Sequence, residues 1–336
     1  MRAPTGFDQK AFFNFCRQLR REHKNREVTK VLHDALRRYQ LDANGILQAG
    51  RMLPQLGNTE DNTLNVAILG QCTTTWLVPA LTAIARGRNQ ELNVVEADYD
   101  NVIQGIGSLD PNVDAVILVP WTQRVFHPDN RSAGQRVQDE LQFWQSAWNM
   151  LAKRTDLHVV QVGYDWIDAG SDGHFLGVGD GGCIDIIRTL NTELRKTLPA
   201  GSYLVDLEQV SGTLGREHFY DRRQYFWTKQ PFSDAGVVRV AEHIWAGLRA
   251  ATTGPKKVLV LDLDNTLWGG VVGELGPLGI ELGDTPAGEA FRDFQRLAQS
   301  LAKRGCLVAV CAKHNPEDAR GPFEQNPQMI LSVDDI

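Results

Sequence analysis

Short apolar runs alternate with amphipathic stretches through the middle of the chain. The runs are NVAILG, which begins at Asn65, and then LNVVEAD, VDAVILVPW, LHVVQVGY and SYLVDLEQV. Such runs are typical of parallel strands that are buried on both faces. The stretches between them, such as QRVQDELQFWQSAWNMLAKRT, repeat apolar residues every three or four positions, which predicts helices. The alternation predicts an α/β fold with a doubly wound parallel sheet, whose ligands bind at the carboxyl ends of the strands.

Two further segments flank this region. The first 60 residues have a helical pattern, in which REVTKVLHDALRRYQL places apolar side chains on one face: Val28, Val31, Leu32, Leu36 and Tyr39. After the short linker ATTGPKK, the strand VLVLDLD, the helix AGEAFRDFQRLAQSLAKRG and the strand CLVAVC begin a second α/β unit. The sequence therefore predicts three parts: a helical N-terminal segment (1–60), a parallel-sheet domain (61–251) and a second α/β domain (252–336).

Composition narrows the class of protein. The 336 residues are 42% hydrophobic and 23% charged, which is ordinary for a globular protein, and the net charge of −6 argues against a general nucleic-acid binder. The sequence has no apolar run long enough to span a membrane and no secretory signal. The five cysteines are odd in number and lack metal-ligand spacing, so we expect a cytoplasmic protein. Cys306 and Cys311 flank an apolar run and are expected to be small buried hydrophobes.

Two carboxylates close the strand VLVLDLD. Alternation along the strand predicts that Asp262 and Asp264 point to one face, with Leu261 and Leu263 on the other. With Thr266 nearby, such a pair can hold Mg²⁺, while one carboxylate attacks phosphorus and the other handles the proton. An Asp-Asn turn after a strand is the simpler alternative for so short a motif.

The motif is longer than a pair of aspartates, and VLVLDLDNTLWGG resembles motif I of the haloacid dehalogenase (HAD) superfamily. Together with GEAFRDFQRLAQSLAKRG and LVAVCAKHN, it is similar to the FkbH-like proteins over nearly all of residues 256–336. The similarity extends, less strongly, to the SGNH-hydrolase-like domain that precedes the phosphatase domain in many members. The resemblance implies a Rossmann-like phosphatase domain, with Asp262 as phosphoryl nucleophile, Asp264 as acid/base, and Thr266 and Lys313 in contact with the substrate.

The chain departs from the HAD pattern in two ways. Ala312 stands where motif II usually has Ser or Thr. The sequence given ends at LSVDDI, before the lysine of motif III and the acidic residues of motif IV that complete the Mg²⁺ site. The resemblance therefore predicts a partial phosphatase domain in which Mg²⁺ binds weakly or is absent.

The resemblance also implies a reaction. FkbH-like proteins take a glyceryl unit from 1,3-bisphosphoglycerate, dephosphorylate it and load it on the phosphopantetheine thiol of an acyl carrier protein in polyketide-type biosynthesis. Gly70, Gln71 and Cys72 stand where SGNH hydrolases have Gly-Asp-Ser, so Cys72 takes the place of the nucleophilic serine. A thiol between a strand and a helix N-terminus is expected to have a lowered pKa, with backbone N–H groups placed for an oxyanion. A buried, inert cysteine is the alternative.

The remaining SGNH-like positions are less distinct. Gly105 or Gly107 could supply an oxyanion N–H group, and Asn191 lies in the middle of a predicted helix. The hallmark Asp-x-x-His is absent, and Lys229 stands near the expected histidine; His218 is a candidate base. Basic residues in or beside the strand-end loops could bind phosphate groups: Arg124, Arg131, Arg136, Arg222, Arg223 and Lys229.

The sequence thus predicts an enzyme, a transferase that forms a glyceryl thioester on Cys72 and passes it to a carrier protein, with associated dephosphorylation. An SGNH-like esterase or thioesterase is one alternative, although no strong base occupies the histidine position. A non-catalytic docking protein with a degenerate phosphatase fragment is another, favoured by Ala312. The sequence leaves open the natural product, the carrier protein, the oligomeric state, the base for Cys72 and the order of dephosphorylation and transfer.

Overall fold

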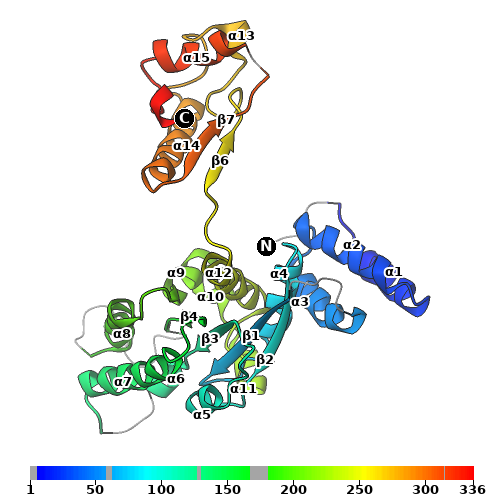
Figure 1. Cartoon of the computed structure of the whole chain (residues 1–336), viewed down its shortest axis with the longest axis vertical. Coiled ribbons are helices and arrows are strands. Elements are labelled where there is room, and N and C mark those ends of the chain that lie inside the picture. The colour runs from blue at the N-terminus through cyan, green and yellow to red at the C-terminus, as the bar shows by residue number, and fades with distance from the viewer. Residues whose placement is uncertain (1–5, 58–62, 127–129, 167–180, 314) are drawn as a thin grey trace. The chain divides into compact units, whose positions relative to one another are not determined.

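The computed structural model describes residues 6–57, 63–126, 130–166, 181–313 and 315–336 (Figure 1). The chain divides into two compact units, Met1–Thr253 and Gly254–Ile336. In the described parts of the chain, none of the helices combines the length and the apolar character that crossing a membrane requires.

The first unit is built on a parallel sheet. Its strands are β1 (Thr63–Gly70), β2 (Glu91–Glu96), β3 (Ala115–Val119), β4 (His158–Val162) and β5 (Tyr203–Val205), in the order β2-β1-β3-β4-β5. The predicted α/β fold with a parallel sheet is therefore confirmed. The strand order reverses between β1 and β3, and in doubly wound sheets ligands bind at such a switch point.

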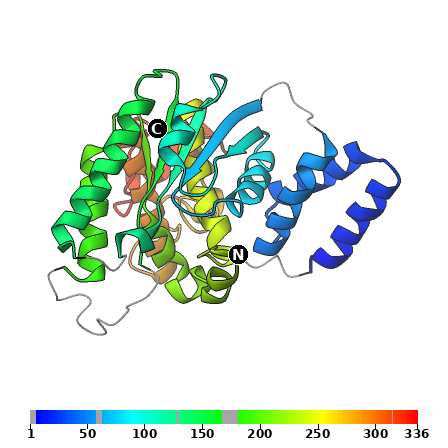
Figure 2. The ribbon, with the colours of Figure 1, turned by 90° about the horizontal axis from the view of Figure 1, so that it is seen from below.

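Helices cover both faces of this sheet. Val66 and Ile68 of β1 face a core formed with α4 (Leu77–Arg86) and α12 (Asp234–Thr252). Ala67 and Leu69 face a second core, formed with α5 (Val102–Gly107), α7 (Ala133–Leu151) and α8 (Cys183–Thr197). Figure 2 shows the green α7–α8 layer on the opposite side of the unit from the blue N-terminal helices. Short helices follow the strand ends: α6 (Thr122–Val125), α9 (Leu207–Leu214), α10 (Arg216–Phe219) and α11 (Arg222–Thr228).

The N-terminal helices share the core of the sheet. They are α1 (Gln9–Arg21), α2 (Asn25–Arg37) and α3 (Ala43–Met52), followed by the 3-10 helix η1 (Leu53–Leu56). Gly50 allows α3 to approach α4 closely, since a Cβ atom there would lie 1.8 Å from the carbonyl oxygen of Pro79. Val28, Leu32 and Leu36 are buried as predicted.

Tyr39 departs from the predicted helical face. It is 56% exposed, although the periodicity of the sequence placed it on the same face as Val28, Leu32 and Leu36, which are buried. The reason is that α2 ends at Arg37, and Tyr39 has a φ of 54°, so the helical repeat no longer determines where its side chain points.

The second unit has a two-stranded parallel sheet of β6 (Val258–Leu261) and β7 (Leu307–Val310), with α13 (Val272–Leu275), α14 (Pro286–Lys303), α15 (Pro316–Gln325) and the 3-10 helix η3 (Val333–Asp335). Leu261 and Leu263 are buried as predicted. Unlike the strands of the first unit, β6 is not buried on both faces, because Val258 and Val260 are 51% and 60% exposed. The core of this unit packs against one face of the two strands, so alternate side chains of β6 point outward.

The cysteines of the second unit are more accessible than predicted. Cys306 is half-buried and Cys311 is exposed, whereas both were expected to be buried. They lie just before and just after β7, beyond the part of the strand that the core covers.

Candidate functional site

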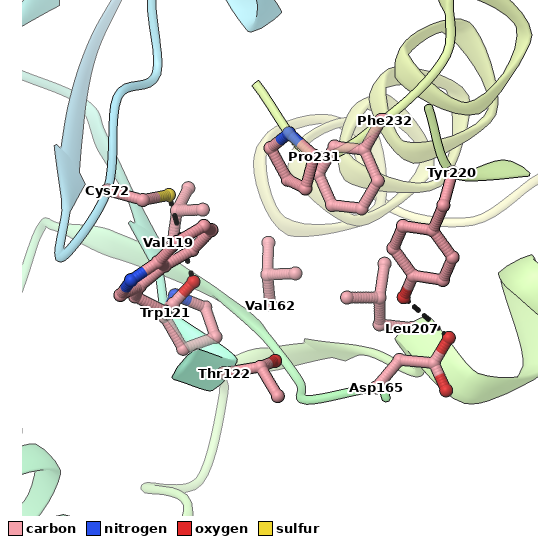
Figure 3. Close-up of a pocket in the computed structure, with 11 residues that line it drawn as sticks. Cys72, Val119, Trp121, Thr122, Val162, Asp165, Leu207, Tyr220, Pro231 and Phe232 are labelled. Atoms are coloured by element: carbon pink, nitrogen blue, oxygen red, sulfur yellow. Dashed lines mark hydrogen bonds between the residues drawn. The ribbon is translucent and has the colours of Figure 1, made fainter. Parts of the chain in front are cut away.

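A pocket lies where β1, β3, β4 and β5 end in the first unit (Figure 3). The space between its lining atoms is about 360 Å³ when the open solvent at its mouth is counted, so the pocket is a cleft rather than an enclosed cavity. Its lining comes from the loops after these strands and from the segment before α12: Cys72, Val119, Pro120, Trp121, Thr122, Val162, Asp165, Leu207, Tyr220, Pro231 and Phe232. The pocket therefore occupies the switch point of the sheet, where a ligand site is expected.

The loop after β1 is held in a tight conformation. Gly70 has no room for a side chain, since a Cβ atom would lie 2.5 Å from Cγ2 of Thr74 and 2.8 Å from the carbonyl oxygen of Cys72. The backbone N–H of Gln71 donates to the carbonyl oxygen of Val119 at 2.9 Å, and its Oε1 accepts from the backbone N–H of Trp121 at 2.9 Å. Gln71 thus ties the end of β1 to the end of β3 and fixes the position of Cys72.

A buried polar network extends from Gln71 into the α7 layer. Nε2 of Gln71 donates to Oε1 of the buried Glu140 at 2.7 Å, and the same carboxylate oxygen accepts from the hydroxyl of Tyr164 at 2.6 Å. Nε1 of Trp144 donates to the Tyr164 oxygen at 2.6 Å, and Nε of Arg124 lies 3.8 Å from Oε2 of Glu140. These contacts satisfy a carboxylate that would otherwise be costly to bury. Gln71 is therefore a positioning residue.

Cys72 lines the pocket, but its environment differs from the predicted one. Helix α4 begins at Leu77, five residues further on, with Trp76 as N-cap, so the thiol is not at a helix N-terminus. The residue is 4% exposed, and the thiol donates to the carbonyl oxygen of Pro120 at 3.8 Å. Burial raises the pKa of Cys72 from 9.0 to about 12. The predicted lowering of its pKa is wrong, because desolvation disfavours the thiolate.

The backbone N–H of Gly105, a predicted oxyanion donor, already makes a hydrogen bond within its own helix. Gly105 lies inside α5, and its N–H donates to the carbonyl oxygen of Asn101 at 2.8 Å. Gly107 is the last residue of the same helix. Closer candidates are the backbone N–H groups of Cys72 and Thr73, which make no hydrogen bond within the described part of the chain.

A carboxylate and a phenol face Cys72 from the opposite side of the pocket, with Val162 between them (Figure 3). The Asp165 side chain is fully buried, and its oxygens accept from Nη2 of Arg216 at 2.9 Å and from the hydroxyl of Tyr220 at 2.6 Å. Burial, followed by the Asp165 charge, raises the pKa of Tyr220 well above its ordinary range. Sequence reasoning missed this pair, although Asp165 follows the apolar run of β4 at a strand end.

The side-chain amide of Asn191 already makes its hydrogen bonds within the fold. This buried amide accepts from the backbone N–H of Tyr164 at 2.8 Å and donates to the Tyr164 carbonyl oxygen at 2.9 Å. Asn191 therefore fixes the segment between β4 and Asp165, and both ends of its amide are already paired.

His218 lies on α10 with its side chain exposed. Its backbone carbonyl accepts from the hydroxyl of Ser233 at 2.6 Å, and its backbone N–H donates to the carbonyl oxygen of Gly215 at 3.0 Å. It does not line the pocket among the described residues. The basic residues of α11 lie beside the entrance instead. The ring of Tyr225, on α11, is 5.5 Å from the ring of the pocket residue Trp121, and Nζ of Lys229 is 5.2 Å from the centre of the Tyr225 ring.

Arg222 and Arg223 are exposed on the first turn of α11. The guanidinium of Arg223 lies 4.9 Å from the ring centre of Trp227, which is 75% exposed. Exposed aromatic rings beside cationic side chains form a surface next to the pocket entrance, which we call the α11 rim: Arg222, Arg223, Phe226, Trp227 and Lys229.

The three other candidate arginines line a separate polar pocket of about 430 Å³ with Asp139, Glu140 and Phe143. Nη1 of Arg124 donates to Asp100 at 2.7 Å, and Nη1 of Arg131 donates to Asp139 at 2.9 Å. Nη1 of Arg136 donates to the carbonyl oxygen of Val125 at 2.9 Å. Acidic side chains thus balance much of the positive charge in this pocket.

In the second unit, Asp262 is exposed directly after β6, and Asp264 is partly buried in the following loop. Oδ1 of Asp264 accepts from Nε1 of Trp268 at 3.0 Å and from the N–H of Val272 at 3.1 Å. Because β6 and β7 are parallel neighbours, Lys313 follows β7 at the same edge of the sheet. Over the described residues, no group of three or more His, Cys, Asp or Glu side chains is placed to hold a metal ion.

The fold and pocket define an α/β protein with a ligand site at the switch point of a parallel sheet. The family model of the FkbH N-terminal domain matches residues 65–246, which include all five strands of this sheet except the first two residues of β1, and the chain belongs to the FkbH family. It is also similar to a crystal structure of the N-terminal part of the protein BF1531 from Bacteroides fragilis, which contains a phosphatase domain and is complexed with Mg.

That similarity has a TM-score of 0.71 at 28% sequence identity and covers 92% of this chain and 79% of the other. A comparison with curated proteins found no match. The family and the phosphatase-containing neighbour together indicate an enzyme with hydrolase-like activity.

Proposed function

We propose that the protein transfers a glyceryl unit from 1,3-bisphosphoglycerate through a thioester on Cys72 to the phosphopantetheine thiol of an acyl carrier protein. The observation that carries this proposal is the position of Cys72. Its sulfur lines the pocket at the switch point of the sheet, inside the region that matches the FkbH N-terminal domain. A thiol is the nucleophile suited to making a thioester that a second thiol can accept.

The raised pKa of Cys72 constrains how the thiol reacts. Cys72 holds its proton at neutral pH, and the other ionisable groups lining the pocket, Asp165 and Tyr220, lie across it (Figure 3). We propose that the departing phosphate takes this proton. The C–O bond of the acyl phosphate breaks as the C–S bond forms, and the thiol proton leaves with the phosphate oxygen. The N–H groups of Cys72 and Thr73 stabilise the oxyanion meanwhile.

Removal of the remaining phosphate is assigned to the second unit in this proposal. Asp262 and Asp264 offer two carboxylates at the edge where β6 ends, and oxygen ligands of this kind suit Mg²⁺. Two protein carboxylates supply only part of an octahedral shell, so the described residues fit a weakly held ion. When bound, Mg²⁺ would neutralise charge on the phosphate. Asp262, the more exposed carboxylate, is the proposed nucleophile, with Thr266 and Lys313 nearby.

The carrier protein is proposed to dock on the α11 rim. This surface adjoins the pocket entrance through the Trp121–Tyr225 contact, and its cationic side chains suit an acidic partner. Replacing Arg222 and Arg223 by Glu should slow carrier loading, more so at low salt, while the acylation of Cys72 by a small donor is unchanged. The matched control is Arg20→Glu and Arg21→Glu at the end of α1, which reverses the same number of charges. Equal effects of the two double substitutions would contradict docking at the rim.

The proposed function is tested by intact-mass analysis and peptide mapping after incubation with 1,3-bisphosphoglycerate. We expect one three-carbon adduct, on Cys72, and its transfer to a carrier protein. Cys72→Ser should lose most carrier loading, because an oxygen ester transfers poorly to a thiol. Cys16→Ser is the matched control, since Cys16 is also buried and burial raises its pKa to about 11. Full loading by Cys72→Ala, or an adduct confined to another cysteine, would refute the proposal.

One observation favours a second candidate function. A buried thiol that keeps its proton, as Cys72 does, is also what a non-catalytic docking protein would have. In that case the protein would bind the carrier protein with unchanged affinity after Cys72→Ala and would form no adduct with any acyl donor.

A further inference from the structure

The pocket has two chemically different ends. Cys72 forms one end, and Asp165 with Tyr220 forms the other (Figure 3). The side chains between them are mostly apolar: Val119, Val162, Leu207, Pro231 and Phe232. An acyl chain attached to Cys72 would therefore run along an apolar wall toward a polar end.

The polar end can only accept hydrogen bonds. The single proton of Tyr220 is donated to Oδ2 of Asp165 at 2.6 Å, so the phenol oxygen offers only lone pairs to the pocket. Both Asp165 oxygens act as acceptors here, since Oδ1 accepts from Nη2 of Arg216 and Oδ2 accepts from the hydroxyl of Tyr220. Arg216 is itself held in place by Trp166, whose ring centre lies 3.8 Å from the guanidinium carbon.

We propose that Tyr220 and Asp165 select acyl groups that carry a hydroxyl by accepting a hydrogen bond from it at the end of the pocket opposite Cys72. This inference rests on the proposed function, since it assumes that the acyl group is held on Cys72. A chain without a hydroxyl leaves these buried acceptors unpaired.

The test compares two acyl donors, the N-acetylcysteamine thioesters of glyceric and propionic acids. The initial rate of Cys72 acylation is measured by intact mass under subsaturating conditions. Each rate is divided by the rate of the same donor with free N-acetylcysteine, which removes differences in intrinsic reactivity. We expect the glyceryl donor to be preferred over the propionyl donor by about tenfold, the effect of about 1.4 kcal/mol.

Two substitutions separate recognition from stability. Tyr220→Phe should reduce the preference to about twofold or less, because one neutral hydrogen bond accounts for about this difference. Tyr164→Phe is the matched control: its phenol also donates to a buried carboxylate at 2.6 Å, but it lies outside the pocket lining. It should keep the glyceryl preference. An unchanged preference in Tyr220→Phe, or equal rates for the two donors, would overturn the inference.

A binding measurement makes the inference independent of thioester formation. Cys72→Ala is titrated with glyceramide and with propionamide, followed by NMR line broadening. Tighter binding of glyceramide supports the inference even if no donor acylates Cys72, an outcome that would refute the proposed function alone. Equal binding of the two amides overturns the inference even if Cys72 is acylated. The same titration serves if Tyr220→Phe fails to fold.

Discussion

The reactivity of Cys72 toward an alkylating reagent should report its burial directly. A rise in pKa from 9.0 to about 12 makes the thiolate about a thousandfold rarer at neutral pH, a difference of about 4 kcal/mol. At pH 7 only about one molecule in a hundred thousand carries the thiolate. Cys72 is 4% exposed, so restricted access slows the reaction further.

The assay is alkylation of the folded protein by iodoacetamide between pH 7 and pH 10, followed by peptide mapping. The Cys72 rate should rise about tenfold for each pH unit and should not level off in this range, since only the thiolate reacts and its pKa lies above it. The exposed Cys311 monitors the reagent in every sample, and the urea-unfolded chain shows Cys72 without burial. A plateau of the Cys72 rate below pH 9 would refute the reasoning, because it would mean that the site stabilises the thiolate.

The same pKa predicts a pH dependence of stability. Between pH 9.0 and about 12 the unfolded chain has lost the Cys72 proton while the folded protein keeps it. The unfolded state binds fewer protons in this window, so stability falls as pH rises through it. Between pH 9 and pH 10.5, the loss of the Cys72 proton from the unfolded chain should lower the free energy of unfolding by about 2 kcal/mol. Cys72→Ala should therefore lose stability less steeply than the parent in urea titrations, and parallel slopes would contradict the assignment.

Three further predictions concern packing and the second unit. Gly50→Ala should lower stability by about 1–3 kcal/mol, because the added methyl group meets the Pro79 carbonyl oxygen; an unchanged urea midpoint would count against this close approach. Gln71→Leu should cost about 2 kcal/mol in thermal unfolding, because Glu140 loses a buried donor, and a neutral result would mean that the network adds little. Mg²⁺ should bind weakly in calorimetry, and Asp264→Asn should weaken it further; tight, stoichiometric binding would show that other ligands complete the shell.

The periodicity of the sequence determined the architecture of the first unit. Apolar runs of strand length that alternate with helical repeats can bury their side chains only in a parallel sheet with helices on both faces. The chain position of Cys72, directly after the first such run, already placed it at the strand ends where ligands bind. Leu261 and Leu263 were predicted to lie on the face opposite Asp262 and Asp264, and both leucines are buried while Asp262 is exposed.

The chemistry of the site was decided by the tertiary structure. The sequence predicts a loop between β1 and α4, but it does not show where the helix begins or how deeply the loop is buried. The distance of Cys72 from the helix start and the rise in its pKa could therefore not be foreseen. Asp165 and Tyr220 are 55 residues apart and meet only because β4 ends beside the segment that leads into α12. Burial and long-range pairing depend on what packs around a residue, and the local pattern of a sequence does not contain that information.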